Sequence, residues 1–298
     1  MIKSYPRRAL EVALVAALLW VAAPALAQVS KASKPKKVFV ITDLEGVDGV
    51  FDFNLQCIPF KSPLYAESRK LLTNEVNAAI QGLYEGGATS IVVYDNHYGG
   101  HNLSGLTINP KVLLLSGSPV SSTLGLDRSY SAIIFIGLHS MAGTENGVLP
   151  HSFTWDIQNI WVNGRKVGEI GARVMLAGEL GIPAIMLSGD AAACHEFLDL
   201  VPRGQCAPVK KGESHSGGTT LSNPAACNLI RQKARLAMQH LAEIKPYPVA
   251  GPSVVKVQFV SSATPYFAAR PGVKQLSGRT WEFKGRDFIH AWLKFRSF

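Results

Sequence analysis

Short apolar runs alternate with amphipathic segments along most of the sequence. Residues 38–41 form a continuous apolar run, as expected of a strand buried on both faces. From residue 64 to 84 the apolar positions recur at helical spacing, and Gly86-Gly87 ends this segment as a helix commonly ends. The same patterns predict strands at 90–94, 112–115, 132–136, 185–187 and 253–260, helices at 166–180, 191–200 and 222–243, and a last strand and helix within 281–295.

Alternating strands and helices indicate an α/β fold. We expect a three-layer α/β/α arrangement around a largely parallel, mixed central sheet. The sequence carries no internal repeat and no low-complexity linker, so residues 37–298 are predicted to form a single domain.

The first residues have the features of a secretory signal peptide. Lys3, Arg7 and Arg8 precede a short apolar core at 12–23, and Ala25-Leu26-Ala27 supplies the small-x-small cleavage pattern. We therefore expect a signal peptide at 1–27, a polar leader at 28–36, and export to the periplasm. An uncleaved membrane anchor is the alternative, although the core is shorter than the roughly 20 residues that span a bilayer.

Charge and cysteine content narrow the function classes. The formal net charge is +9, but the basic residues are scattered apart from a run at 31–37. Without a stripe of alternating basic and aromatic residues, nucleic-acid binding is not expected. The four cysteines include no Cys-x-x-Cys pair, so neither a thiolate zinc site nor a redox motif is indicated. In an oxidising compartment they predict one structural disulfide or buried thiols, with the pairing left open.

Residues that bind metals follow several of the predicted strands. Asp43 and Glu45 follow the first, His97 the second, His139 a third and Asp190 a fourth. In open α/β sheets, ligands bind at the carboxyl ends of the strands, so these side chains are expected to converge. Any one of them has an ordinary alternative, such as helix capping by an aspartate or a structural histidine. Their joint position after strands favours a common site.

The converging donors are nitrogen and oxygen atoms, a set that suits zinc, manganese or a similar divalent ion. Asp43 and Glu45 are two residues apart, so in extended chain their side chains point the same way. Glu169 is a further candidate ligand, with an ordinary first-turn helix glutamate as the alternative. His151 lies in a loop that could bring its imidazole over the metal to move protons; a surface histidine is the alternative.

Other hydrolase and nucleotide-binding signatures are absent from the sequence. It contains no Gly-x-Ser-x-Gly elbow and no His-Glu-x-x-His zinc motif. It also lacks a phosphate-binding loop and a Gly-x-Gly-x-x-Gly dinucleotide fingerprint.

Five short motifs in order resemble those of the D-aminopeptidase family of zinc peptidases, the dipeptide-transport-operon aminopeptidases. They are Asp43-Leu44-Glu45-Gly46, the Asp95-to-Asn102 segment around His97, Gly137-Leu138-His139, Pro150-His151-Ser152 and Val167-Gly168-Glu169-Ile170-Gly171. Each is weak alone, but their order and spacing are specific, and the likeness extends from Val38 to the C-terminus.

This resemblance implies a two-zinc centre held by Asp43, Glu45, His97, His139 and Glu169, with His151 as the catalytic residue. It implies release of an N-terminal D-amino acid from short peptides by a ring-like homo-oligomer. Asp95, Asn102 and Asp190 are expected to bind substrate or to support the ligands. Arg173 and His215 depart from the family pattern, where asparagine and arginine are common.

Two further functions fit the same residues. One is a two-metal amidase or phosphoesterase that acts on another substrate. The other is a periplasmic peptide-binding protein with a non-catalytic metal site, which would have no need of His151. Hydrolysis of a D-residue-headed peptide separates the enzyme from the binding protein.

Overall fold

The computed structural model describes Met1 and residues 36–296, apart from 104, 106, 118–122, 263–266, 268 and 269. All described helices and strands belong to one unit of the chain, residues 35–298. The expected signal peptide at 1–27 and all of the polar leader except Lys36 lie outside the described residues.

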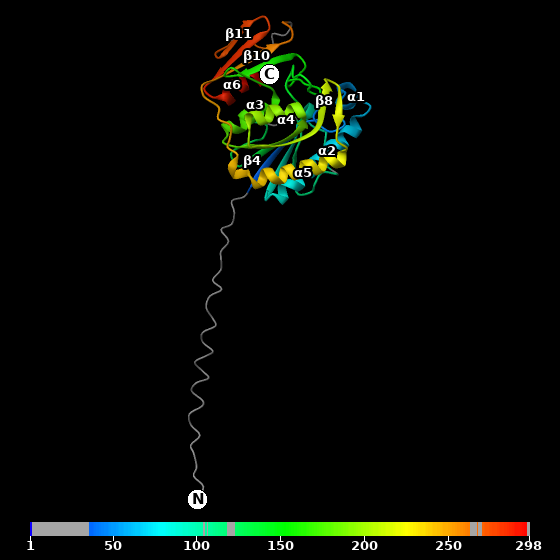
Figure 1. Ribbon diagram of the computed structural model, residues 1–298. Coiled ribbons are helices and arrows are strands. Elements are labelled where there is room, and N and C mark those ends of the chain that lie inside the picture. Colours follow the sequence, from blue (N-terminus) through cyan, green and yellow to red (C-terminus); the bar gives the residue numbers. More distant parts are fainter. Residues whose placement is uncertain are drawn as a thin grey trace. The chain divides into compact units, whose positions relative to one another are not determined.

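The larger of two sheets has seven strands in the order β3-β2-β1-β4-β7-β8-β9 (Figure 1). Their bounds are Lys37–Thr42 for β1, Ser90–Asp95 for β2, Leu113–Leu115 for β3, Ala132–Leu138 for β4, Ala184–Asp190 for β7, Gln205–Ser214 for β8 and Gly217–Thr220 for β9. All neighbours run parallel except the β8–β9 hairpin. Every residue of β4 and β7 is buried, as expected of central parallel strands that begin with apolar runs.

Helices cover both faces of this sheet. Figure 1 shows α2 (Tyr65–Glu85) and α5 (Asn223–Gln239) on one face, and α3 (Glu169–Glu179) and α4 (Ala191–Leu200) on the other. The buried positions of α2 recur every three or four residues, so one stripe of the helix enters the core. A mostly parallel sheet flanked by helices confirms the predicted α/β fold class.

A second sheet, which the sequence patterns did not reveal, has five antiparallel strands in the order β11-β12-β10-β5-β6. The strands are β5 (Ile157–Val162), β6 (Arg165–Val167), β10 (Ser253–Phe259), β11 (Val273–Ser277) and β12 (Thr280–Gly285), with α6 (Phe288–Arg296) packed against them. This sheet has its own core, which includes Val255, Phe283 and Phe288. Central strand β10 pairs with β5, almost a hundred residues earlier, and no local pattern specifies such a partner.

Local boundaries also differ from the prediction in one place that affects the site. The helix expected at 166–180 begins at Glu169, because residues 165–167 pair with β5 as strand β6. Gly168 occupies the N-cap position in an extended conformation. Glu169 therefore lies in the first turn of α3, where the helix dipole favours a negative charge.

One disulfide, Cys194–Cys206, connects α4 to β8, while Cys57 and Cys227 are free thiols. The expectation of one structural disulfide is met, and the buried Cys57 matches the alternative of a buried thiol. Among the described helices, none combines the length and apolar character needed to cross a bilayer.

Candidate metal centre

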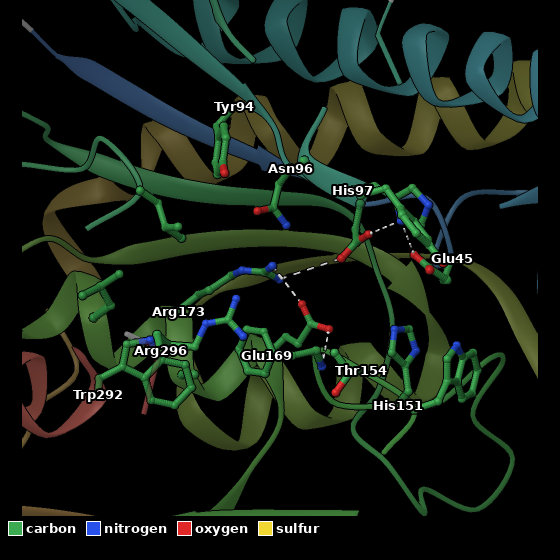
Figure 2. Close-up of a pocket in the computed structure, with 18 of the residues that line it drawn as sticks. Glu45, Tyr94, Asn96, His97, His151, Thr154, Glu169, Arg173, Trp292 and Arg296 are labelled. Carbon is green, nitrogen blue, oxygen red and sulfur yellow. Dashed lines mark hydrogen bonds and ion pairs between the residues drawn. The ribbon is translucent and has the colours of Figure 1, made fainter. Parts of the chain in front are cut away.

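Neighbouring strands of the seven-stranded sheet bring the predicted ligands to one edge. Asp43 follows β1, His97 follows β2 and His139 follows β4, and these three strands are adjacent in the sheet. Glu45 extends the β1 turn, and Glu169 begins α3 on the same side. The six predicted ligand and catalytic residues are all buried; five of them line one pocket (Figure 2), and the sixth, His139, stacks against His151 behind its wall. They are Asp43, Glu45, His97, His139, His151 and Glu169.

His97 is oriented by a backbone carbonyl. Its Nε2 lies 2.7 Å from the carbonyl oxygen of Cys57. Since a carbonyl can only accept, Nε2 carries the proton and donates. In the neutral ring Nδ1 is then a lone pair, and it lies 3.1 Å from Asp43 Oδ1 and 3.1 Å from Glu45 Oε2. Three electron-rich atoms therefore face one another, which requires a proton or a metal cation between them.

His139 repeats this arrangement. Its Nδ1 lies 3.0 Å from the Ser140 carbonyl oxygen, so Nδ1 donates and Nε2 faces the pocket. Nε2 lies 3.3 Å from Glu169 Oε1 and 4.0 Å from Asp43 Oδ2. Neither His139 Nε2 nor Glu45 Oε2 forms a hydrogen bond within the described part of the chain, although both atoms are buried. Buried atoms of this kind need a partner, and a divalent cation would supply it.

His151 lies above His139 in a stack of flat rings. The two imidazoles are 3.9 Å apart at 9°, and the Trp155 ring covers the other face of His151 at 4.5 Å. His151 Nδ1 lies 2.9 Å from the Leu149 carbonyl oxygen, to which it donates. Its Nε2 is therefore the acceptor of the neutral ring.

Two sets of three side chains could each hold a cation. One set is Asp43, Glu45 and His97, and the other is His139, His151 and Glu169, with the offered atoms of each set within 4.8 Å of one another. Asp43 reaches both sets, because its Oδ1 faces His97 and its Oδ2 faces His139. Imidazole nitrogen with carboxylate oxygen is a donor set that fits zinc.

The remaining predicted residues support the ligands. Asp95 accepts hydrogen bonds from the backbone N–H and the side-chain amide of Asn102, and that amide also donates to the His97 carbonyl at 2.6 Å. Asp190 caps α4 and accepts from the backbone N–H of Val148 at 2.8 Å, which shapes the loop that carries His151. None of the three lines the pocket.

Gly46 and Lys210 hold the turn after β1 in place. A Cβ at Gly46 would lie 2.0 Å from the Leu138 carbonyl oxygen, so only glycine allows this approach between the turn and the end of β4. The ammonium of buried Lys210 donates to the carbonyls of Glu45 and Val50. Sequence patterns could not identify Lys210, because a lysine in an alternating strand such as β8 is normally solvent-exposed.

Protonation follows from the excess of buried negative charge. Burial and the neighbouring Glu45 raise the pKa of Asp43 to about 6. Burial opposes ionisation of Glu45 too, but the His97 imidazolium holds its pKa well below the usual range. In turn the carboxylates outweigh burial at the histidines: Glu45 and Asp43 raise the pKa of His97, and Glu169 raises that of His139 to about 10.

Two groups at the edge of the centre, His151 and Glu169, have lowered pKa values. Burial and the neighbouring His139 lower the pKa of His151, so this ring is neutral at neutral pH. Burial disfavours the charge of Glu169, yet Arg173 and His139 together lower its pKa. Arg173 NH2 lies 2.8 Å from Glu169 Oε2. In the sequence, Arg173 stands out only as a departure from the family pattern. Its position four residues after Glu169 places both side chains on one helix face, which explains their contact.

Three comparisons place these observations among known proteins. The model of the D-aminopeptidase family matches residues 36–297. A D-aminopeptidase of Bacillus subtilis (strain 168) is 30% identical over 260 residues, which cover 86% of this chain and 94% of that protein. The solved structure of the Zn-dependent D-aminopeptidase DppA from Bacillus subtilis, a self-compartmentalizing protease, aligns with a TM-score of 0.82 at 28% identity. That alignment covers 88% of this chain and 96% of the other.

Zinc binding to the metal-free protein should release about two protons per chain at pH 7. His97 and His139 are protonated there, because both pKa values are raised, and a ligating imidazole must be neutral. Titration calorimetry in buffers of different ionisation enthalpy measures the number released. Zinc affinity should keep rising with pH above 6.5 and level off only near 10.

The matched variants are His139→Gln, which should remove about one released proton, and His240→Gln on the exposed surface, which should remove none. If zinc binds at pH 7 without proton release, neither histidine gives up a proton to the metal, and the prediction is wrong.

Proposed function

The chain belongs to the D-aminopeptidase family, and from this premise we propose an exported two-zinc aminopeptidase that removes N-terminal D-residues from short peptides. Membership makes it a peptidase of a family with a zinc-dependent member of the same fold. One observation carries the metal assignment: His97 and His139 each donate one ring N–H to a backbone carbonyl and present the other nitrogen to buried carboxylates. Metal-binding histidines are held in this way.

In the proposed centre Asp43, Glu45 and His97 hold one zinc ion, and His139 with Glu169 holds the second. Asp43 supplies one oxygen to each side. Zinc bound here would supply an acidified water and a Lewis-acid contact to the scissile carbonyl. The mixture of imidazole and carboxylate also permits manganese.

The proposed catalytic residue is His151. Its neutral ring has Nδ1–H donating to the Leu149 carbonyl, so Nε2 can accept a proton from the attacking water and return it to the leaving amine. The flanking rings of His139 and Trp155 restrict the imidazole to one plane. The preference for an N-terminal D-residue is supported by the names of both relatives.

Zinc-loaded mature protein should hydrolyse D-alanyl dipeptides much faster than their L-alanyl counterparts. A chelator should abolish the reaction and zinc should restore it, since carboxylates and imidazoles cannot themselves act as the Lewis acid that the reaction needs. His151→Gln should lower kcat by about 100- to 10,000-fold, the usual contribution of a general base, while two zinc ions per chain remain bound. Release of free D-alanine and zinc content by atomic absorption measure both.

His195→Gln, on the exposed side of α4, is the matched control and should change neither quantity. If no amide is cleaved with zinc fully bound, the proposed activity is wrong. If His151→Gln loses one zinc ion, His151 is a metal ligand rather than a base.

We also propose that the protein is exported and cleaved after Ala27. Support comes from the basic, apolar and Ala-x-Ala segments in order, and from the Cys194–Cys206 disulfide, which is stable in an oxidising compartment. Expressed with its full N-terminus in a Gram-negative host, the protein should be recovered from the periplasmic fraction with Gln28 as its first residue. Recovery of the uncleaved chain from membranes would instead establish an anchor.

A homo-oligomer is the proposed assembly. The solved relative is a self-compartmentalizing protease. In this chain Tyr98 and Trp155, about 60% and 50% exposed, both pack on Phe53 at the pocket mouth and form an exposed aromatic surface. Such surfaces mark interaction sites. Light scattering of the purified mature chain should give a mass that is a multiple of the monomer; a monomer at micromolar concentration would contradict the proposal.

A further inference from the structure

The pocket continues past the proposed metal centre into a cationic end. Its volume is about 690 Å³, and beyond Glu169 it lies between α3 and α6. Two arginines line this end, Arg173 from α3 and Arg296 from the last position of α6. Figure 2 shows both side chains directed toward the cavity, with Trp292 beside Arg296.

Arg173 has unused hydrogen-bonding capacity. Only 5% of the residue is exposed, and it lies beside two acids, Glu169 and, less closely, Asp43. Its NH1 lies 3.9 Å from Asp43 Oδ2, and neither NH1 nor Nε forms a hydrogen bond with the described residues. A buried guanidinium with two free donor groups needs an acceptor.

Arg296 adds a second positive charge at the same place. The guanidinium carbons of Arg296 and Arg173 lie 4.8 and 5.8 Å from the centre of one aromatic ring, that of Phe153. Arg296 is exposed and forms no ion pair with a described residue; its guanidinium lies near the rings of Phe153 and Phe295, and Glu169 acts on its charge from farther away. Two like charges therefore lie around one ring, and the carboxylates beside them, Glu169 and Asp43, also face His139.

We propose that Arg173 and Arg296 bind a carboxylate of the substrate, placed one residue beyond the scissile bond. This subsite rests on the proposed aminopeptidase function, because the scissile carbonyl is assumed to lie at the metal ligands. Guanidinium groups bind carboxylates through paired, charge-assisted hydrogen bonds, and a cavity closed by aromatic rings strengthens them.

The distance sets the length of the substrate. Arg173 contacts Glu169 and approaches Asp43, so its free donors lie directly beside the metal ligands. An extended peptide advances about 3.5 Å per residue. The C-terminal carboxylate of a dipeptide therefore reaches the arginines, whereas that of a tripeptide lies about 3.5 Å farther along the chain. An acidic side chain on the second residue offers the same chemistry.

Substrate pairs that differ only in charge test this subsite. D-alanyl-glycine should exceed D-alanyl-glycinamide in kcat/KM by about 10- to 100-fold, mostly through KM, since one charge-assisted pair of hydrogen bonds is lost. D-alanyl-glycyl-glycine should fall between them. Comparing D-alanyl-glutamic acid α-amide with D-alanyl-glutamine α-amide then shows whether a side-chain carboxylate can replace the C-terminal one.

Substitutions of Arg296 test whether it causes the preference for a free carboxylate over an amide. Arg296→Gln should reduce the acid-over-amide preference to about threefold or less, because one of the two guanidinium partners of the carboxylate is lost. Arg296→Lys should retain part of the preference, because it keeps the charge but loses the planar pair of donors. Arg203→Gln, on the exposed surface beside Glu243, is the matched control and should keep the full preference.

The outcomes separate the two hypotheses. If neither D-alanyl-glycine nor its amide is cleaved, the aminopeptidase function fails and the subsite with it. If both are cleaved at equal rates by the native protein, only the subsite is wrong. An unchanged preference in Arg296→Gln would likewise overturn the role of Arg296, even if Arg173→Gln proves too unstable to assay.

Discussion

The structure depends on the burial of three carboxylates, Asp43, Glu45 and Glu169, within one small volume. All three are at most 5% exposed, so each negative charge needs a proton, a cationic side chain or a metal ion beside it. Without metal, the protonated His97 and His139 supply part of that charge, and Arg173 supplies more. Two atoms of this arrangement, Glu45 Oε2 and His139 Nε2, are still without a hydrogen-bond partner in the described chain. The protonated histidines and Arg173 therefore balance the three carboxylates in charge, but these two atoms still lack a partner, and this distinguishes a candidate metal centre from a set of buried ion pairs.

The sheet brings the ligands together, and the backbone orients them. Adjacent parallel strands β2, β1 and β4 end at one edge, which places His97, Asp43 and His139 side by side with little dependence on loop conformation. In each imidazole, one ring nitrogen donates a hydrogen bond to a backbone carbonyl: His97 to Cys57, His139 to Ser140 and His151 to Leu149. A ring held at one nitrogen can present only the other, so the direction of every lone pair follows from backbone positions. Lys210 extends this control to the Glu45 turn through two further carbonyls.

Much of this centre could be anticipated from sequence because strand ends are local features. The apolar run at 38–41 predicts where the strand ends, and the residues that follow it face the crevice whatever the rest of the chain does. Lys210 and Arg296 were not predicted, because each reaches the site through a contact distant in sequence. Lys210 meets a turn 165 residues earlier, and Arg296 belongs to a helix packed on the second sheet. That sheet was missed for the same reason: β5 is only six residues long and does not alternate apolar and polar residues regularly, and its partner β10 is specified by three-dimensional packing.

The second sheet gives the pocket its chemical asymmetry. One end carries the carboxylates Asp43, Glu45 and Glu169, while the other, beside α6, carries Arg173 and Arg296. The arginines are complementary in charge to a carboxylate of the proposed substrate. Glu169 connects the two ends, since Oε1 faces His139 and Oε2 faces Arg173. A cation bound to Glu169 weakens the attraction between Glu169 and Arg173. The donors of Arg173 then become more available to an anion. Metal loading and carboxylate binding should therefore favour one another, and by linkage the substrate carboxylate strengthens metal retention by the same factor.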